Sequence, residues 1–330
     1  MKKAVKAIIA EPGLIPPLPA REHIRYGEYN SISDEALFAW FAGKQKTWSQ
    51  PPYGYTIAAI SEDKIVGWIR CDTDHFDSET FGFPCMHMTT PYLFTECDED
   101  ADAIVKTMLK ELERELKKEY GKVHLRCGIG NAPLKNSYIL NSAIAAGFVY
   151  IQTLLTFVLP EGRDMPAPPE QYGDLIIRPS VADDAKHVAN IAGSSFMYSR
   201  YHMDPFLDNS KADNLLYNSA RNSIIEGFAD TVFVAELKGK IVGYYSGKKL
   251  QEPASGKVAG EAVISAVDSD SRGLGVFSKL DDHLLYWFCK NVDFAEMGTY
   301  LINRPVIRTW VGKQLPIIRG THQLSKLITR

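Results

Sequence analysis

The chain has 330 residues, of which 45% are hydrophobic and 23% charged, the composition of a folded globular protein with one or two domains. Its 37 Lys and Arg against 40 Asp and Glu give a net charge of −3. This balance excludes broad electrostatic binding to nucleic acid or to an anionic membrane as the main activity. A local basic groove remains compatible with it.

Cysteine spacing and hydropathy indicate the cellular compartment of the protein. The five cysteines are irregularly spaced and form no C-x-x-C pair, which argues against a disulfide framework or a structural zinc site. The basic N-terminus has too short an apolar run for a signal peptide. Residues 143–159 are apolar, but Gln152 and Thr156 interrupt them, so we expect a helix end, a turn and a buried strand there. The sequence predicts a soluble, cytoplasmic protein without metal and without a nucleic-acid or membrane partner.

A linker divides the chain almost in half. Residues 159–174 contain four prolines and two glycines. Each half contains a strand, a turn and a second strand that starts K-I-V-G-aromatic, at Lys64–Trp68 and at Lys240–Tyr244. The repetition predicts a duplicated domain, with an N-terminal copy over residues 1–164 and a C-terminal copy over residues 165–330.

Helices and terminal strands fill the rest of each half. Residues 101–121 carry apolar side chains on one helical face, and residues 183–192 read as a helix that follows a strand at 175–180. Residues 141–159 and 308–327 each read as a short helix, a turn and a terminal strand. We therefore predict an α/β (α+β) fold.

The most informative stretch joins a strand to a helix. An alternating strand over residues 258–267 leads through Asp268–Ser271 into Arg272-Gly273-Leu274-Gly275-Val276, and a helix starts at Phe277. Glycines at such a turn expose backbone N–H groups at the positive end of a helix, where phosphate binds. The pattern is neither a Walker loop nor a Rossmann turn. We expect a phosphate or pyrophosphate cradle, and the alternative is a tight turn that caps the helix.

The cradle resembles that of the GNAT acetyltransferase superfamily, whose pattern is R/Q-x-x-G-x-G/A. Arg272, Gly273 and Gly275 fit this pattern, while Phe277 stands where a small residue is usual. Asn303 matches the family's downstream asparagine, but its tyrosine is replaced by Trp310. The resemblance implies tandem GNAT-like domains, each a mixed, mostly antiparallel sheet flanked by helices, with acetyl-CoA as co-substrate and no metal.

Two further segments narrow the resemblance. Residues 75–83 and 196–205 are similar to segments of dTDP-fucosamine acetyltransferase-like proteins, which acetylate the amine of a 4-amino-4,6-dideoxy sugar attached to dTDP. In the first half, Gly147-Phe148 fits the family's terminal segment, yet no R-x-x-G-x-G precedes it. The N-terminal domain therefore resembles a degenerate GNAT domain without a cofactor cradle, and the C-terminal domain is expected to hold acetyl-CoA.

The resemblance assigns roles to residues of the C-terminal half. Acetyl is expected to pass directly to the amine in a ternary complex, because no side chain need attack the thioester. The strand before the cradle should splay from its neighbour and offer backbone groups to the pantetheine. The expected acetyl-CoA contacts are Ile264, Ala266, Val267, Arg272, Gly273, Leu274, Gly275, Val276, Phe277 and Asn303.

The acceptor side is expected around residues 200–204, with Arg200, Tyr201 and Asp204 as substrate-binding residues. His202 and Glu261 are the candidate bases, since an imidazole with an ordinary pKa near 6.5 suits removal of an ammonium proton. Both also have structural alternatives: a loop-bonded histidine and an exposed strand residue. A hydrolase triad of Ser199, His202 and Asp204 is disfavoured, because the three crowd into six residues without a nucleophile elbow.

Trp310 is the third expected catalytic residue, placed beside the thiol where the family has a phenol that protonates the thiolate. An indole supplies no useful proton, so solvent or Tyr300 would have to do so. The leading function is an N-acetyltransferase whose partner is a small-molecule amine acceptor, expected to be a nucleotide-linked amino sugar. The alternatives are a GNAT enzyme for another small amine or amino acid, and a non-catalytic acyl-CoA-binding protein. A homodimer stays open.

Overall fold

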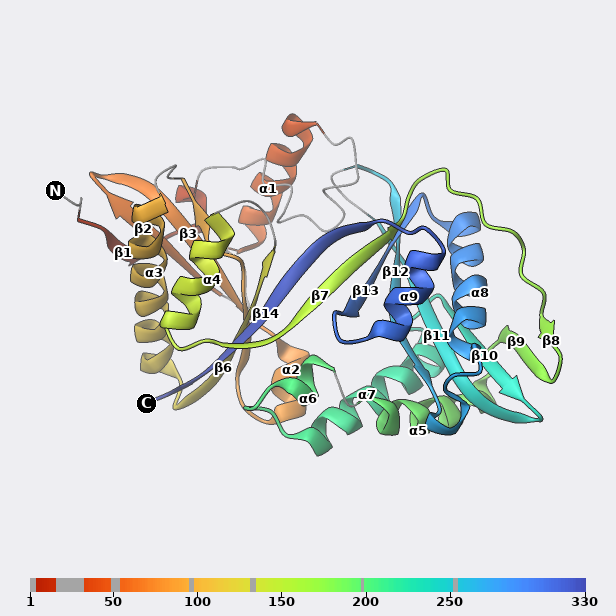
Figure 1. Ribbon diagram of the computed structural model, residues 1–330. Coiled ribbons are helices and arrows are strands. Elements are labelled where there is room, and N and C mark those ends of the chain that lie inside the picture. The colour runs from red at the N-terminus through yellow and green to blue at the C-terminus, as the bar shows by residue number, and fades with distance from the viewer. Residues whose placement is uncertain are drawn as a thin grey trace. The chain divides into compact units, whose positions relative to one another are not determined.

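The computed structural model describes residues 4–15, 33–48, 54–94, 98–130, 135–196, 199–251 and 255–330. The chain forms two compact units (Figure 1). The first unit consists of Met1–Thr153 together with Arg319–Arg330, and the second unit consists of Leu154–Ile318. No helix in the described part of the chain is long and apolar enough to cross a membrane.

The first unit is a mixed sheet with helices. Its strands run in the order β1-β2-β3-β4-β6-β14, antiparallel except for the β4–β6 pair, and β5 pairs with β3. The elements are β1 (Lys6–Ile9), the 3-10 turn η1 (Pro12–Leu14), α1 (Asp34–Trp48), β2 (Tyr55–Ser61), β3 (Lys64–Thr73), α2 (His75–Phe81), β4 (Cys85–Met88), β5 (Tyr92–Leu93), α3 (Asp98–Glu119), β6 (Lys122–Gly130), α4 (Lys135–Ala145) and the C-terminal strand β14 (Ile317–Thr329).

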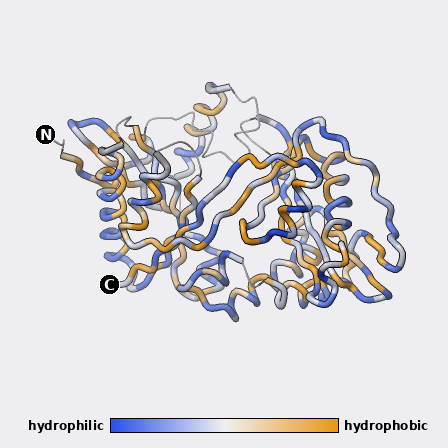
Figure 2. The backbone as a smooth tube through the Cα atoms, viewed as in Figure 1, coloured by the Kyte–Doolittle hydropathy of each residue, from blue (hydrophilic) through white to orange (hydrophobic). Residues whose placement is uncertain are grey.

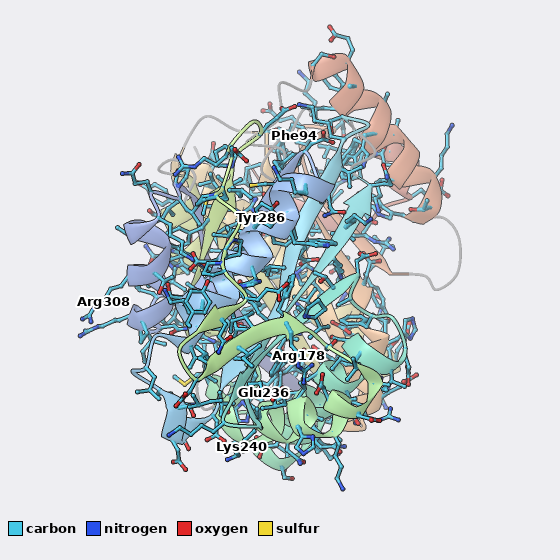
Figure 3. All side chains as sticks on the ribbon, turned by 90° about the vertical axis from the view of Figure 1, so that its right-hand side faces the viewer. Phe94, Arg178, Glu236, Lys240, Tyr286 and Arg308 are labelled. Atoms are coloured by element: carbon cyan, nitrogen blue, oxygen red, sulfur yellow. The ribbon has the colours of Figure 1, made fainter. Side chains whose placement is uncertain are left out.

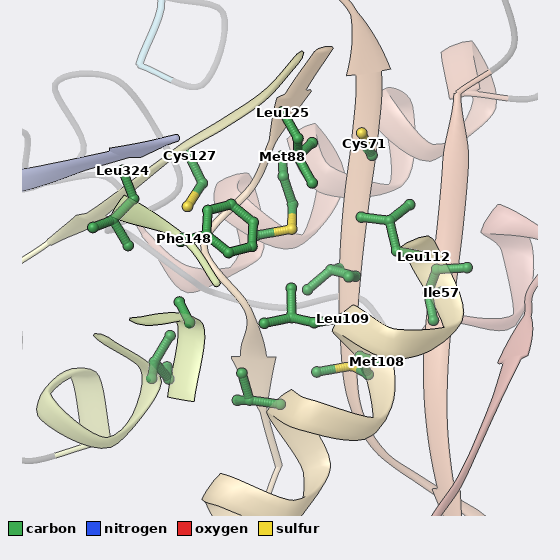
Figure 4. Close-up of a cluster of buried hydrophobic side chains, with 14 of the residues drawn as sticks. Ile57, Cys71, Met88, Met108, Leu109, Leu112, Leu125, Cys127, Phe148 and Leu324 are labelled. Carbon is green, nitrogen blue, oxygen red and sulfur yellow. The ribbon is translucent and has the colours of Figure 1, made fainter. Parts of the chain in front are cut away.

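Helix α3 supplies much of the first unit's core. Hydrophobic and hydrophilic residues alternate along it (Figure 2). Its Met108, Leu109 and Leu112 lie in one buried cluster with Ile57 of β2 and Leu125 of β6 (Figure 4). Burying each such side chain stabilises the fold by about 1.5–3 kcal/mol. The predicted amphipathic helix at 101–121 is thus confirmed, with its apolar face on the sheet.

The second unit is also a mixed, mostly antiparallel sheet. Its strands run in the order β7-β13-β12-β11-β10-β9-β8, and only β12 and β13 are parallel. The elements are β7 (Val149–Leu159), β8 (Gln171–Tyr172), β9 (Leu175–Pro179), the 3-10 turn η3 (Ala182–Asp184), α5 (Ala185–Ser195), α6 (Arg200–Met203), α7 (Asn209–Ile225), β10 (Thr231–Leu237), β11 (Lys240–Gln251), β12 (Val258–Val267), the 3-10 turn η4 (Ser269–Ser271), α8 (Val276–Asn291), β13 (Phe294–Tyr300) and α9 (Arg304–Gly312).

Helices cover both faces of the second unit's sheet. Leu280, Leu284 and Phe288 of α8 are fully buried on one face. Gly260 of β12 makes room for this helix, because a Cβ there would lie 2.6 Å from Phe288 Cδ1. On the other face, α5 and α7 pack over a second cluster that includes Tyr244. The predicted fold class, a mixed mostly antiparallel sheet flanked by helices, is confirmed.

An ion-pair network fixes the start of α5 to the sheet edge. Arg178 of β9 lies beside Glu236 of β10 (Figure 3), with 3.1 Å between Nε and Oε2. Its Nη1 also donates to Asp184 Oδ2 at 2.7 Å. The Asp184 carboxylate in turn accepts from the Val181 N–H and so closes the first turn. One guanidinium therefore ties two strands to the helix start.

The hairpins of the two units repeat each other in detail. Both β2–β3 and β10–β11 are antiparallel, and both turns take the left-handed conformation at two successive residues. A register shift falls at the same place before the K-I-V-G sequence, between Ala59 and Ile60 in β2 and between Ala235 and Glu236 in β10. Matching irregularities of this kind support a duplication.

The terminal strands β7 and β14 each begin in one unit and continue into the other, so the two units do not divide at the expected boundary between residues 164 and 165. β7 begins in the first unit, but Leu154–Leu159 pair with β13 in the second. β14 begins at the end of the second unit, but residues 321–329 pair with β6 in the first. The sequence predicts both strands, whereas the sheet that each one joins depends on long-range hydrogen bonding.

Candidate functional site

The strands β12 and β13 form a fork in the second unit. They pair in parallel only at Ala259–Phe294, Gly260–Ala295 and Glu261–Glu296. Beyond these pairs, β12 continues to Val267 beside β11 alone, and β13 continues to Tyr300 beside β7 alone. We call residues 262–267 and 297–300 the fork. Backbone groups of β12 on its open side are therefore available to a ligand, as the predicted splay requires.

A bulge in β12 lies within the fork. The register against β11 passes from Gly247–Ala262 to Tyr245–Ser265, so Val263 and Ile264 both stand opposite Ser246. The fully buried Ser246 hydroxyl accepts from the Ile264 N–H at 3.2 Å and donates to the Ile264 carbonyl at 3.0 Å. A bulge bends and twists its strand, which accounts for the departure of β12 from β13.

The loop after β12 leads into an uncapped helix. Gly273 and Gly275 take the left-handed conformation, with φ of 82° and 75°, and no atom lies within 4 Å of a Cβ built on either. Gly275 is the N-cap of α8, and no side chain caps this helix. Its first-turn N–H groups thus have no intrahelical acceptor and present partial positive charge. This geometry fits a phosphate group.

Asp268 shapes this loop. Its carboxylate accepts from the Asp270 N–H at 3.2 Å and lies 3.4 Å from Lys240 Nζ. The Asp270 hydrogen bond, followed by the Lys240 charge, lowers the pKa of Asp268. The negative charge of Asp268 is therefore held on the strand side of the loop and partly neutralised there.

Arg272 connects the loop to its surroundings. Its Nε donates to the Val267 carbonyl at 3.3 Å and its Nη2 to the Ser195 carbonyl at 3.2 Å, at the end of α5. A guanidinium has five N–H donors, so donors remain for an anion. Leu274, between the glycines, has 63% of its surface exposed. The structure therefore brings Val267, Arg272, Gly273, Leu274 and Gly275 together around one open loop.

Four other expected cofactor residues can contribute only backbone groups or lie in the core. Ile264 and Ala266 place their side chains in the cluster under α5 and α7. Val276 is 2% exposed, and Phe277 packs on Tyr245 with ring centres 5.6 Å apart. These four assignments remain predictions that concern main-chain contacts.

Asn303 lies at the same end of the fork as the glycine loop. The carboxyl ends of parallel strands meet at one edge of a sheet, and Asn303 follows β13 as the loop follows β12. Its side-chain amide donates to Thr299 Oγ1 at 3.0 Å, and the residue is exposed at the start of α9. Its expected contact with the cofactor remains a prediction.

The expected acceptor residues lie on α6 and directly after it. The Arg200 guanidinium lies 4.0 Å from the ring centre of Tyr201 and donates to its hydroxyl. Asp204 is 5% exposed and accepts from the Phe206 N–H at 3.0 Å. His202 is hydrogen-bonded through both ring nitrogens, one of them to Ser199. All four expected side chains, Arg200, Tyr201, His202 and Asp204, already have partners within the fold.

Two carboxylates stand side by side where the fork begins. Glu261 of β12, the expected base, is opposite Glu296 of β13 in the last parallel pair. Lys248 Nζ lies 3.3 Å from Glu261 Oε2, and Glu296 is 6% exposed. The sequence analysis missed Glu296, although a charged residue in an otherwise apolar buried strand was a usable signal.

Trp310 lies in the hydrophobic core. It is 1% exposed and packs on Phe157 with ring centres 5.0 Å apart. Its indole N–H donates to Asp281 Oδ1 at 2.9 Å, and Lys313 Nζ lies 2.6 Å from the other oxygen of this fully buried carboxylate. Burial raises the pKa of Asp281, and the Lys313 charge opposes the shift. The indole N–H is thus occupied, and the expected position of Trp310 beside a thiol has no support in these contacts.

The first unit lacks a comparable fork in its described part. All of β4, Cys85–Met88, pairs in parallel with β6. Thr90 then donates to the Gly128 carbonyl at 2.6 Å. The expectation that the N-terminal domain holds no cofactor remains a prediction.

The fold is similar to solved N-acetyltransferase structures, whereas the sequence matches no family model and no curated protein. A GCN5-related N-acetyltransferase from Sphaerobacter thermophilus is 12% identical, covers 99% of this chain and 96% of its own, and has a TM-score of 0.60. A tandem GNAT protein from the clavulanic acid biosynthesis pathway is 14% identical over 99% of both chains, with a TM-score of 0.53.

A third similar structure is a fungal GCN5-related glucosamine N-acetyltransferase region in a multi-domain GH3 β-N-acetylglucosaminidase. It is 9% identical, with a TM-score of 0.60, and covers 99% of this chain but 38% of that longer one. At these identities the likeness concerns the fold. The chain therefore shares its fold with these structures over nearly its whole length.

Proposed function

We propose that the protein is an N-acetyltransferase that transfers acetyl from acetyl-CoA to the amine of an amino sugar, with its active site in the second unit. The observation that carries this proposal is the β12–β13 fork, which leads directly into the glycine loop and the uncapped α8. The fork offers strand backbone to an extended amide-containing chain, and the loop offers N–H groups to a pyrophosphate. Coenzyme A combines these two chemical features.

The residues of the loop fit the cofactor. A Cβ at Gly273 or Gly275 would meet no atom within 4 Å, so the open space there can accept phosphate oxygens. The Gly273, Leu274 and Gly275 N–H groups and the first turn of α8 would hold the pyrophosphate, with Arg272 beside it. Acetyl-CoA supplies an activated acetyl thioester when bound, and the backbone of residues 262–267 would orient it.

Acetyl transfer then requires a neutral amine and a base. The amine nitrogen forms a bond to the acetyl carbon while the carbon–sulfur bond breaks, and one amine proton must leave. His202 and Glu261 are the candidate acceptors of this proton. General bases contribute typically 10²–10⁴-fold to a rate, so removing the true base should lower kcat by about that factor.

An amino sugar suits the charge at the fork. Glu261 and Glu296 are opposite each other in the last parallel pair, with Lys248 beside Glu261, and a carboxylate attracts an ammonium group. Carboxylates also accept hydrogen bonds from sugar hydroxyls. The likeness to a glucosamine N-acetyltransferase region supports the same substrate class. Arg200 would bind a nucleotide phosphate if the sugar is nucleotide-linked.

A panel of amines tests the proposal. Thiol release from acetyl-CoA is measured with glucosamine, a dTDP-linked 4-amino-4,6-dideoxyhexose, spermidine and several amino acids, alongside calorimetric titration with CoA. We expect thiol release with the amino sugars. Release only with the other amines would establish a different acceptor class. CoA binding without release from any amine would indicate an acyl-CoA-binding protein, the alternative that the buried Trp310 favours. Absence of CoA binding would overturn the site.

A further inference from the structure

Ser199, His202 and Asp213 form one continuous line of hydrogen bonds. Ser199 Oγ lies 2.7 Å from His202 Nδ1, and His202 Nε2 lies 2.9 Å from Asp213 Oδ1. Ser199 precedes α6, His202 lies on α6 and Asp213 lies on α7. The serine and the imidazole are 8% exposed, while the Asp213 carboxylate is 51% exposed. The line therefore runs from a buried hydroxyl to a solvated carboxylate.

The chemistry of the three groups assigns their protons. An ionised carboxylate only accepts hydrogen bonds, so His202 Nε2 must carry a hydrogen and donate it to Asp213. In a neutral imidazole the other nitrogen is then an acceptor. His202 Nδ1 therefore accepts from the Ser199 hydroxyl. This is the proton arrangement of a serine held ready to give up its proton to a histidine.

Other contacts connect the segment before Ser199 to the glycine loop and to β12. Arg272 of the glycine loop donates to the carbonyl of Ser195. Phe196 packs against the cluster that contains Ile264 and Ala266 of β12. Ser199 follows Phe196 by three residues, so it lies within about 11 Å of it even along a fully extended chain. The segment that leads into Ser199 is therefore held against the glycine loop and the cluster under β12.

We propose that Ser199, His202 and Asp213 form a proton relay for the acyl transfer, an inference that rests on the proposed function. As the amine nitrogen bonds to the acetyl carbon, its proton passes to Ser199 Oγ while the hydroxyl proton of Ser199 passes to His202 Nδ1. The carbon–sulfur bond breaks, and its electron pair leaves on the thiolate. The imidazolium then carries the proton, and Asp213 stabilises it as a positioning residue.

The relay also explains how His202 can act as the base although both of its ring nitrogens already have hydrogen-bond partners. Both ring nitrogens are occupied, so a direct attack of His202 on the substrate proton is blocked, whereas Ser199 can transmit the proton. Glu261, the other candidate, is in an ion pair with Lys248. The two candidates therefore make different predictions for Ser199 variants.

Kinetics of three variants test the relay. In Ser199→Ala we expect kcat for the amino sugar to fall about 100-fold or more, and in Asp213→Asn at least tenfold. In both variants the KM for acetyl-CoA and the affinity for CoA should be unchanged. Glu226→Gln, which changes an exposed carboxylate at the end of the same helix α7, should retain the wild-type kcat. Retention of kcat within twofold in Ser199→Ala would overturn the relay, as would an equal loss in Glu226→Gln.

A spectroscopic measurement keeps the test independent of turnover. Long-range ¹H–¹⁵N correlation of the His202 ring should show Nε2 protonated and Nδ1 unprotonated in the wild type, and a changed pattern in Asp213→Asn. A wild-type ring protonated on Nδ1 would overturn the relay even if thiol is released. Conversely, the expected tautomer in a protein that releases no thiol from any amine would support the arrangement and place the failure in the proposed activity.

Discussion

Replacing Gly275 with Asp places a carboxylate at the N-terminus of α8, where the glycine loop would hold a pyrophosphate. The site has open space, since no atom lies within 4 Å of a Cβ at this position. The left-handed φ of 75° costs a non-glycine residue roughly 1–2 kcal/mol. A negative charge at the helix N-terminus stabilises the fold by about 0.3–1 kcal/mol. The fold should therefore lose at most about 2 kcal/mol.

The same carboxylate should weaken CoA binding more than it destabilises the fold. Two like charges about 4 Å apart repel by about 1 kcal/mol in water and about 4 kcal/mol at an effective dielectric constant of 20. At 1.4 kcal/mol per tenfold change, CoA affinity should fall by between about fivefold and a thousandfold. Isothermal titration calorimetry with CoA at physiological salt measures this loss, and urea unfolding measures the stability of the same variant.

Gly256→Asp is the matched control. Gly256 also has a left-handed φ, 72°, and no atom within 4 Å of a Cβ. It lies just before β12, at the opposite end of this strand from the glycine loop. At about 3.3 Å per residue the ten residues of β12 span roughly 30 Å, more than three times the Debye length at physiological salt. Equal CoA affinity in Gly275→Asp and Gly256→Asp would refute the assignment of the glycine loop to the pyrophosphate.

Three predictions concern stability. Lys313→Met leaves the fully buried Asp281 carboxylate without its cation. The free energy of unfolding in urea should fall by about 3–5 kcal/mol. Adding Asp281→Asn should recover most of this loss. Trp310→Phe removes the indole donor to Asp281 and should cost about 1–3 kcal/mol by the same assay; full retention of stability would contradict the core role of Trp310. Burial raises the pKa of Asp184, but the Arg178 guanidinium and a backbone N–H outweigh it and hold the pKa below the ordinary value of 3.8. This contribution is present at neutral pH and lost as pH falls through the folded-state pKa, so Asp184→Asn should be less stable than wild type near pH 7, and the difference should shrink as pH falls below 3.8.

Local sequence patterns predict the helices and strands well, because the spacing of apolar residues in a segment depends on which of its faces is buried. The alternation in 258–267 and the helix after Gly275 appear as β12 and α8. The amphipathic periodicity of residues 101–121 appears in α3. Even the fork was predictable, since the resemblance to GNAT proteins implies a splayed strand before the cradle.

Side-chain partners across elements were not predictable in the same way. Asp213 is 11 residues from His202 and on another helix, so no local motif connects them. The sequence analysis assigned no role to Asp281, yet this residue is fully buried and contacts Trp310 and Lys313. Such partners depend on how helices pack, which one sequence does not encode locally.

The pairing of β14 with β6 has a consequence for synthesis of the protein. β6 ends at Gly130, but the strand that covers its edge begins pairing near Thr321, so roughly 190 residues are translated between them. At 5–20 residues per second, β6 waits about 10–40 s on the ribosome for its neighbour. During this interval an unpaired strand edge is open to other nascent chains. Completion of the first unit therefore waits for residues 321–329 to be made, and a factor that shields the exposed edge should raise the yield of folded protein.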